Sequence, residues 1–331
     1  MKTRRDFLKS MAAVTAGVLA DEATAAPSPA RDRLGDLLPQ RKLGSTGETV
    51  TMLGVGGFHI GGSMSDKTAQ ATIEAALEGG VRFFDTAERY QRGESEKRYG
   101  RYLTPKYREQ VFLMTKTRSY DAASAKRHLE DSLRRLNTDY LDLWQMHSLQ
   151  SPRDVDRRLD QDVLDVLREA KASGKVRHIG FTGHAMPAAH LRMLERTDVH
   201  EVCQLPVSVV DAASEDSFVQ RVLPVLLKRK MGILAMKSLA DGRFFARKKR
   251  VNWKTPDPVV PDRVKLEQAL GFVWSLPVSV LITGPDNPAM MREKIRLAAE
   301  FATLDSAARR ELIGAVADLA EKGRVEYYKK S

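Results

Sequence analysis

Short apolar segments alternate with longer amphipathic segments along most of the chain. The apolar segments lie at residues 50–55, 81–84, 111–115, 141–146, 178–182, 202–205, 232–236 and 278–283. Apolar runs of this length, bounded by turn residues, are typical of buried strands. The pattern therefore predicts eight strands.

The segments between these strands carry apolar residues at helical spacing, most clearly at 67–78, 122–136, 162–172, 216–228 and 261–274. Alternating strands and helices predict a parallel sheet covered by helices. Eight repeats favour a closed (β/α)8 TIM barrel over an open doubly wound sheet, which usually has five or six strands and a glycine-rich first turn. Glycines at 54–57 end the first strand, but we expect no helix directly after them and interpret them as a turn.

Both ends of the predicted barrel domain can be placed on the sequence. Residues 41–50 predict an N-terminal base hairpin that closes the barrel floor, and the barrel domain is expected to span residues 41–331. Polar and proline-containing residues 26–40 are expected to be a linker.

The first 25 residues have the features of an export signal. Residues 3–9 read TRRDFLK, an apolar stretch follows to residue 20, and small residues precede a cleavage site expected after Ala25. The paired arginines resemble a twin-arginine (Tat) signal peptide. This resemblance implies the twin-arginine export machinery as a partner and a periplasmic location for the folded protein. The apolar stretch is too short for a stable membrane anchor.

Composition narrows the possible functions. The formal net charge is +11, but basic residues are interleaved with acidic ones except at residues 243–250 (RFFARKKR), so we expect no nucleic-acid partner. The single cysteine, Cys203, excludes an intramolecular disulfide and a thiolate metal cluster. We also predict no metal, because His147 and His184 have no clear third ligand.

Polar residues gather where the predicted strands end. Asp85 follows the second strand, Tyr90 lies in the same loop, and Lys116 and His147 follow the third and fourth strands. In a TIM barrel these ends meet at one face, where active sites lie. A lysine close to a tyrosine makes the phenol a better acid, a carboxylate keeps that lysine charged, and a histidine can orient a carbonyl oxygen. Taken singly, each residue could instead have a structural role.

Three stretches resemble the aldo-keto reductase family. Residues 84–90 and 93–96 read FDTAERY and GESE, residues 129–147 read LEDSLRRLNTDYLDLWQMH, and residues 174–182 read GKVRHIGFT. The similarity extends over residues 41–301. It implies NAD(P)H-dependent reduction of a small-molecule aldehyde or ketone, with Tyr90 as general acid beside Asp85, Lys116 and His147.

The same resemblance implies a set of cofactor contacts. Thr182 and Gln204 would hold the nicotinamide carboxamide, and Leu239 and Gly242 would lie along the pyrophosphate. Residues 284–294, including Gly284 and Arg292, would approach the adenosine.

Departures from the family pattern concern the cofactor more than the chemistry. Gly183 and His184 replace a usual asparagine, and Met236 stands where an aromatic residue commonly stacks on the nicotinamide. Gly284 and Met290 replace cations that usually bind the 2'-phosphate. We therefore expect NADPH to be favoured modestly, with NADH possible. The alternative function is a non-enzymatic NADPH-binding sensor or regulatory subunit on the same fold.

Overall fold

The computed structural model describes residues 30–245, 260, 263–320, 325–326 and 328–329. The predicted signal peptide and residues 246–250 of the basic cluster lie outside this part of the chain. Within it, no helix has the length and apolar character that a bilayer crossing requires.

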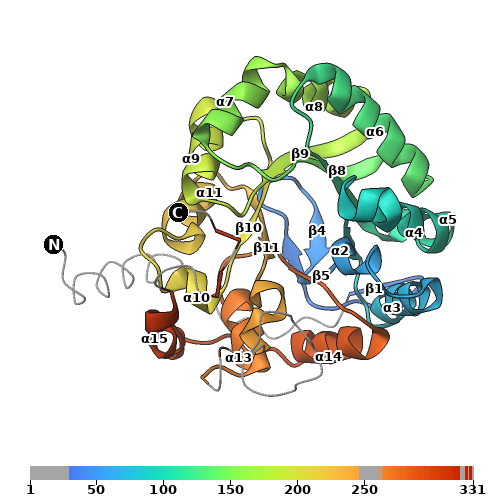
Figure 1. The fold of residues 1–331 in the computed structure, drawn as a ribbon. Helices are drawn as coiled ribbons and strands as arrows, with labels where there is room; N and C mark the ends of the chain where they lie inside the picture. The colour runs from blue at the N-terminus through green and yellow to red at the C-terminus, as the bar shows by residue number, and fades with distance from the viewer. Residues whose placement is uncertain (1–29, 246–259, 261–262, 321–324, 327, 330–331) are drawn as a thin grey trace.

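Eight parallel strands close into a barrel, as the sequence predicts (Figure 1). They are β5 (Leu53–Gly56), β6 (Phe83–Asp85), β7 (Phe112–Thr117), β8 (Leu141–Met146), β9 (Val176–Thr182), β10 (Val202–Pro206), β11 (Gly232–Met236) and β12 (Val280–Thr283). Neighbours in the chain are neighbours in the ring, and β12 pairs with β5 to close it. Strands four places apart, such as β7 and β11, therefore face each other across the barrel.

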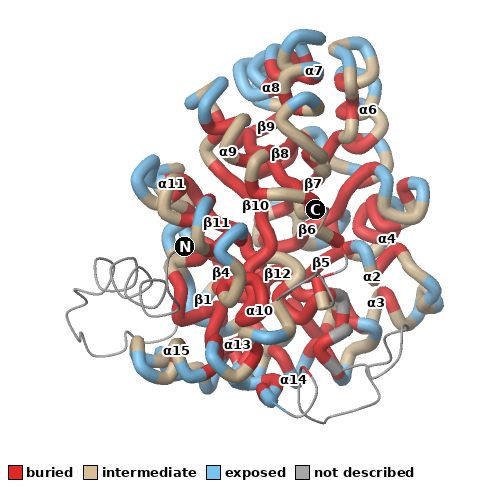
Figure 2. The backbone as a smooth tube through the Cα atoms, turned by 60° about the vertical axis from the view of Figure 1, so that its left-hand side comes forward, coloured by how far each residue is buried: buried red, intermediate tan, exposed pale blue. Residues whose placement is uncertain are grey.

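Helices surround the barrel, and most of them bury one face and expose the other. The longer ones are α3 (Asp66–Glu78), α4 (Glu94–Tyr102), α6 (Ala122–Leu136), α7 (Pro152–Asp160), α8 (Val163–Ala172), α9 (Pro187–Arg196), α13 (Leu266–Trp274), α14 (Pro288–Ala299) and α15 (Ser306–Ala315). Side-chain oxygens of Ser65, Asp121 and Asn287 cap the first turns of α3, α6 and α14. Figure 2 shows buried residues concentrated on the strands and exposed residues on the outer helices.

An apolar cluster inside the barrel closes its N-terminal end. The hairpin of β3 (Gln40–Lys42) and β4 (Thr49–Thr51) adds Leu43 and Val50 to buried strand residues such as Phe83 and Leu143. Gly44, with φ of 57°, lets the hairpin turn lie against β11, because a Cβ there would be 2.3 Å from the Gly232 nitrogen. The predicted floor hairpin is thus present, and catalytic groups can gather only at the opposite end.

Several local expectations were wrong. Residues 50–55 do not form one strand, because the backbone breaks at Met52 between β4 and β5. A short helix, α2 (Gly57–Ile60), opens directly after β5, where no helix was expected. Residues 216–228 form a π-helical turn (Phe218–Val222) before α11 (Leu223–Lys228), because Pro224 cannot donate the backbone hydrogen bond of a regular helix.

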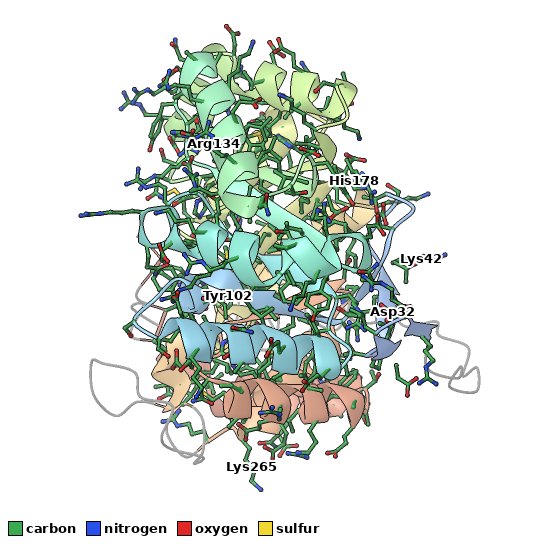
Figure 3. The ribbon with its side chains drawn as sticks, turned by 90° about the vertical axis from the view of Figure 1, so that its right-hand side faces the viewer. Asp32, Lys42, Tyr102, Arg134, His178 and Lys265 are labelled. Atoms are coloured by element: carbon green, nitrogen blue, oxygen red, sulfur yellow. The ribbon has the colours of Figure 1, made fainter. Side chains whose placement is uncertain are left out.

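The described part of the segment expected as a linker, residues 30–40, is docked on the barrel. β1 (Arg31–Asp32) and β2 (Gly35–Asp36) form a small hairpin, and both carboxylate oxygens of Asp32 accept hydrogen bonds from the buried guanidinium of Arg82, at 2.7 and 2.9 Å. Figure 3 shows Asp32, Lys42 and His178 near one end of the barrel. In the described part of the chain, residues 31–36 therefore pack against the barrel.

Candidate active site

A cavity of about 350 Å³ lies at the C-terminal ends of the strands, within the size range of small-molecule sites. Its walls contain every predicted catalytic and cofactor residue except Arg292: Asp85, Tyr90, Lys116, His147, Thr182, Gln204, Met236, Leu239, Gly242 and Gly284. Residues almost 200 positions apart thus meet in one pocket, because parallel strands end at the same face.

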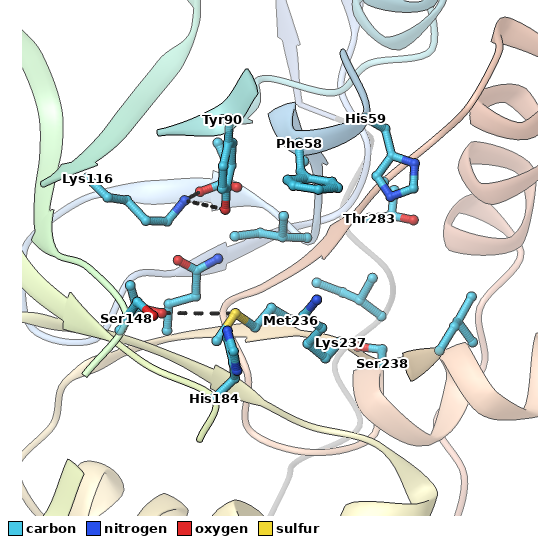
Figure 4. A pocket seen from close by; sticks show the side chains of 18 of the residues that line it. Phe58, His59, Tyr90, Lys116, Ser148, His184, Met236, Lys237, Ser238 and Thr283 are labelled. Carbon is cyan, nitrogen blue, oxygen red and sulfur yellow. Dashed lines mark hydrogen bonds and ion pairs between the residues drawn. The ribbon is translucent and has the colours of Figure 1, made fainter. Parts of the chain in front are cut away.

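The ammonium of Lys116 links the catalytic candidates on β6 and β7. It forms an ion pair with Asp85, donates a hydrogen bond to the Thr86 carbonyl at 2.7 Å, and lies 3.3 Å from the Tyr90 hydroxyl (Figure 4). The Lys116 and Asp85 side chains are only 1% and 3% exposed. Burial raises the pKa of Asp85 and lowers the pKa of Lys116, while the attraction between them opposes both shifts.

His147 completes this side of the pocket as a neutral imidazole. Burial and the nearby charge of Lys116 hold the pKa of His147 well below its usual value. Its backbone is fixed by Thr117, whose carbonyl accepts the His147 N–H at 2.7 Å, and its ring lies edge-on to Tyr90 with centroids 5.8 Å apart. A neutral imidazole carries one ring N–H, which can donate to a carbonyl oxygen.

The loop that carries Tyr90 is held in an unusual conformation. Gln91 and Arg92 have positive φ angles of 46° and 57°, and Gly93 follows at 88°. Left-handed backbone at non-glycine residues costs free energy and persists where the surroundings enforce it. The position of Tyr90 therefore depends on the tertiary structure around its loop. The sequence alone does not reveal these surroundings.

Sequence reasoning missed Glu88, which anchors this loop. Its buried carboxylate accepts the Arg118 backbone N–H at 2.8 Å and lies 2.6 Å from Nδ1 of His128 on α6. Burial raises the pKa of Glu88 to about 7. Glu88 thereby ties the Tyr90 loop to the end of β7, the strand of Lys116. The only sequence signal was an acidic residue between Asp85 and Tyr90.

The opposite wall contains groups that suit a dinucleotide. The Gln204 amide oxygen is buried and has no hydrogen-bond partner among the described residues, so an amide or hydroxyl donor of a ligand could bind it. The Thr182 hydroxyl lies beside it on β9, and Met236 and Leu239 offer apolar surface. At the far end, the wall includes Lys294, which can attract a phosphate. A hydrogen-bond acceptor, a hydroxyl, apolar surface and a basic group together fit a nicotinamide dinucleotide.

The sequence model of the aldo/keto reductase family matches residues 52–325. The chain belongs to this family. It is 29% identical over 300 residues to the oxidoreductase YrpG of Bacillus subtilis, covering 77% of this chain and 89% of that protein. Two solved aldo-keto reductases share its fold. AKR11C1 from Bacillus halodurans has a TM-score of 0.71 and 22% identity, covering 87% of this chain and 99% of that one. The other, from Klebsiella pneumoniae in complex with NADPH, has a TM-score of 0.66 and 20% identity, covering 85% and 96%.

In this aldo/keto reductase, two basic residues on α14 differ in whether they reach the pocket. The predicted contact Arg292 is exposed and does not line the pocket, whereas Lys294 is fully buried and does. Two residues correspond to about 200° around a helix, so only one of them can face the site. Burial lowers the pKa of Lys294 to about 7.

A second feature of this wall joins α2 to the loop that follows β12. Nδ1 of His59, on α2, lies 2.5 Å from the carboxylate of Asp286, which follows β12. Gly284 allows this approach, because a Cβ there would lie 2.3 Å from the His59 ring. The pair closes the β12 side of the pocket mouth.

Proposed function

We propose that this aldo/keto reductase reduces an aldehyde or ketone to an alcohol, with Tyr90 as the proton donor. Carbonyl reduction needs a hydride at carbon and a proton at oxygen, and bound NAD(P)H supplies the hydride. The observation that carries the proposal is the buried Lys116 ammonium, which contacts the Asp85 carboxylate and lies 3.3 Å from the Tyr90 hydroxyl.

Each residue of this group has a distinct role in moving the proton. The Tyr90 hydroxyl donates its proton to the carbonyl oxygen, and the Lys116 ammonium stabilises the phenolate that remains. Asp85 keeps Lys116 charged and directed at Tyr90 despite burial. Neutral His147 donates its ring N–H to the same carbonyl oxygen and orients it.

The opposite wall would hold the cofactor. Thr182 and Gln204 would bind the nicotinamide carboxamide, with the Met236 side chain beside the ring. Leu239 and Gly242 would lie along the pyrophosphate, and Gly284 and Lys294 near the adenosine. Support comes from the unpartnered Gln204 amide oxygen and from the NADPH complex of the Klebsiella pneumoniae relative.

The test separates proton donation from cofactor binding. Tyr90→Phe removes the acid but little cofactor contact, so we expect turnover to fall at least about 100-fold while NADPH addition still quenches intrinsic fluorescence. Tyr140→Phe is the matched control, because Tyr140 precedes β8 and lies outside the pocket lining. Undiminished turnover by Tyr90→Phe on several carbonyl substrates contradicts the assignment. NADPH binding without turnover by the unaltered protein supports the sensor function instead.

We also propose that residues 1–25 direct the folded protein to the periplasm through the twin-arginine pathway. The support is the TRRDFLK sequence, the short apolar stretch and the small residues before Ala25. Changing Arg4 and Arg5 to Lys should leave an active, uncleaved precursor in the cytoplasm. Normal periplasmic appearance of this variant, by cell fractionation, contradicts the proposal.

A further inference from the structure

The charges that line the pocket are almost all positive. The described lining residues include five lysine and arginine side chains, Arg89, Lys116, Arg118, Lys237 and Lys294, and one carboxylate, Asp85. Asp85 is paired with Lys116 inside the catalytic group. The rest of the wall therefore presents an excess of positive charge to whatever enters.

Arg118 is half-buried, and five other buried or half-buried arginines make a contact that it does not make. Arg82, Arg98, Arg108, Arg135 and Arg158 each form an ion pair with a carboxylate. No hydrogen bond or ion pair joins the Arg118 guanidinium to another described residue, although its Nε is buried. A buried donor without a partner carries a desolvation cost that a ligand can relieve. An anionic oxygen is the partner that a guanidinium binds best.

The position of Arg118 assigns it to the substrate rather than to the cofactor. It directly follows β7, lines the pocket near the catalytic group, and is close enough to His147 to lower that residue's pKa. Its backbone N–H is held by Glu88. The groups that suit the cofactor phosphates follow β11 and β12, on the far side of the ring. Figure 4 shows Lys116 and Tyr90 on one side of the pocket and Lys237 and Ser238 on the other.

Two neighbours of Tyr90 complete the substrate side. Arg89, the preceding residue, is exposed at the mouth and likewise has no ion pair with a described residue. Phe58 is 54% exposed, and its ring lies edge-on to that of Tyr90 with centroids 5.4 Å apart. A substrate there meets apolar surface at Phe58 and positive charge at Arg118 and Arg89.

We propose that the substrate is an aldehyde or ketone that carries an anionic oxyacid group, carboxylate or phosphate, bound by Arg118 with Arg89 at the mouth. This inference rests on the proposed carbonyl reduction. The carbonyl oxygen lies between Tyr90 and His147 while the anionic group reaches Arg118. Hydrogen bonds between charged groups contribute about 1.5–3 kcal/mol each, so the anionic group should improve kcat/KM about 10- to 100-fold.

The kinetic test uses substrates matched in shape but not in charge. The first pair is 4-carboxybenzaldehyde and methyl 4-formylbenzoate, whose rings suit Phe58. The second pair is glyceraldehyde 3-phosphate and glyceraldehyde. For each pair, the kcat/KM of the charged member is divided by that of the neutral member. The pair with the larger ratio shows whether the site prefers a carboxylate or a phosphate. In at least one pair, we expect kcat/KM for the charged member to exceed that for the neutral member about 10-fold or more. Arg118→Gln should bring this charged-to-neutral ratio close to one. Arg118→Lys should restore part of it.

The control variant is Arg127→Gln, which removes the same charge from an exposed position on α6 outside the pocket. It should leave the charged-to-neutral ratio unchanged. Equal kcat/KM for charged and neutral members in both pairs overturns the proposal while carbonyl reduction stands. An equal loss of the ratio in Arg127→Gln also overturns it, because the effect would then come from net charge.

Binding by calorimetry gives a readout that does not need turnover. Benzoate should bind the unaltered protein at least about 10-fold more tightly than benzamide, and Arg118→Gln should remove this difference. Absence of turnover on all four aldehydes contradicts carbonyl reduction of those substrates. The binding of benzoate then tests the anion site independently of turnover. Equal binding of benzoate and benzamide overturns the carboxylate form of the proposal, and the glyceraldehyde 3-phosphate pair then decides the phosphate form.

Discussion

Two walls of the pocket each contain a fully buried lysine, but the two lysines have different surroundings. Lys116 contacts the Asp85 carboxylate and the Thr86 carbonyl, and its charge is therefore compensated within the catalytic group. On the other wall, Asp286 attracts Lys294 through space but is itself bonded to His59, and burial lowers the pKa of Lys294 to about 7. On the first wall, contacts within the protein already hold the Lys116 side chain in place. The second retains a cation whose charge a phosphate can stabilise.

The largest expected effect is at Lys116. Lys116→Met leaves Asp85 buried without its counterion, which should lower the free energy of unfolding by about 3–5 kcal/mol. Turnover should fall at least about 100-fold, because nothing then stabilises the Tyr90 phenolate. Urea unfolding and steady-state kinetics measure the two effects. Adding Asp85→Asn should recover part of the stability but not the turnover, and a single variant as stable as the parent would show that the pair is not effectively buried.

Stability should depend on pH through Lys294. Its pKa is lower in the folded protein, about 7, than the usual 10.5, so the unfolded chain binds more protons between these values. The free energy of unfolding therefore rises with pH in that window, by at most about 1.4 kcal/mol per pH unit. Lys294→Met should remove this rise and stabilise the protein below pH 7. Lys67→Met, at an exposed position on α3, is the control, and parallel pH curves for parent and Lys294→Met would contradict the buried charge.

The preference for NADPH over NADH should depend on Lys294 and little on Arg292. At pH 6.5 and low salt we expect NADPH to bind about tenfold more tightly than NADH, equivalent to about 1.4 kcal/mol. The margin should shrink at pH 8.5, because Lys294 loses its proton, and Lys294→Met should abolish it. Arg292→Gln should change it little, since an exposed cation is screened by solvent and salt. Fluorescence titration measures both affinities, and a larger effect of Arg292→Gln would restore Arg292 as the phosphate contact.

The smallest effect is expected at the pair of His59 and Asp286. Their side chains are 24% and 48% exposed, and ion pairs this accessible contribute at most about 1 kcal/mol. Asp286→Asn should therefore lower the free energy of unfolding by less than that, and by less again in 0.5 M salt. Chemical denaturation at two salt concentrations checks it. A loss of several kcal/mol would mean that the contact holds the β12 side of the pocket together.

The sequence predicted the fold better than it predicted the pocket. Each of the eight predicted strand segments overlaps a barrel strand, although the first is broken at Met52, and the helix at 122–136 agrees with α6. The reason is that the spacing of apolar residues reflects which of them are buried within each element. The helix bounds at 67–78 and 162–172 differ by one residue at the start. The docked β1–β2 hairpin was missed, because its main anchor joins Asp32 to Arg82, 50 residues later.

Within the pocket, prediction succeeded where position along a strand was sufficient. Asp85, Lys116 and His147 meet because they lie at the C-terminal ends of consecutive parallel strands, and the order of elements alone places them there. The choice between Arg292 and Lys294 needed the rotation of α14 about its axis, which depends on how the whole helix packs. The roles of Glu88 and Arg118 depend on their spatial neighbours. Glu88 contacts a backbone N–H and a histidine. Arg118 contacts no carboxylate among the described residues.

The sequence by itself determined the strand and helix alternation, the closed barrel, the hairpin at its floor and the family of the chain. These features come from periodicity, turn chemistry and motifs, which act within a few residues. Tertiary structure alone decided which cations face the pocket, which are compensated and which loop holds Tyr90 in place. The physical reason is that the free energy of a buried charge depends on the groups within a few ångströms, and those groups come from distant parts of the chain.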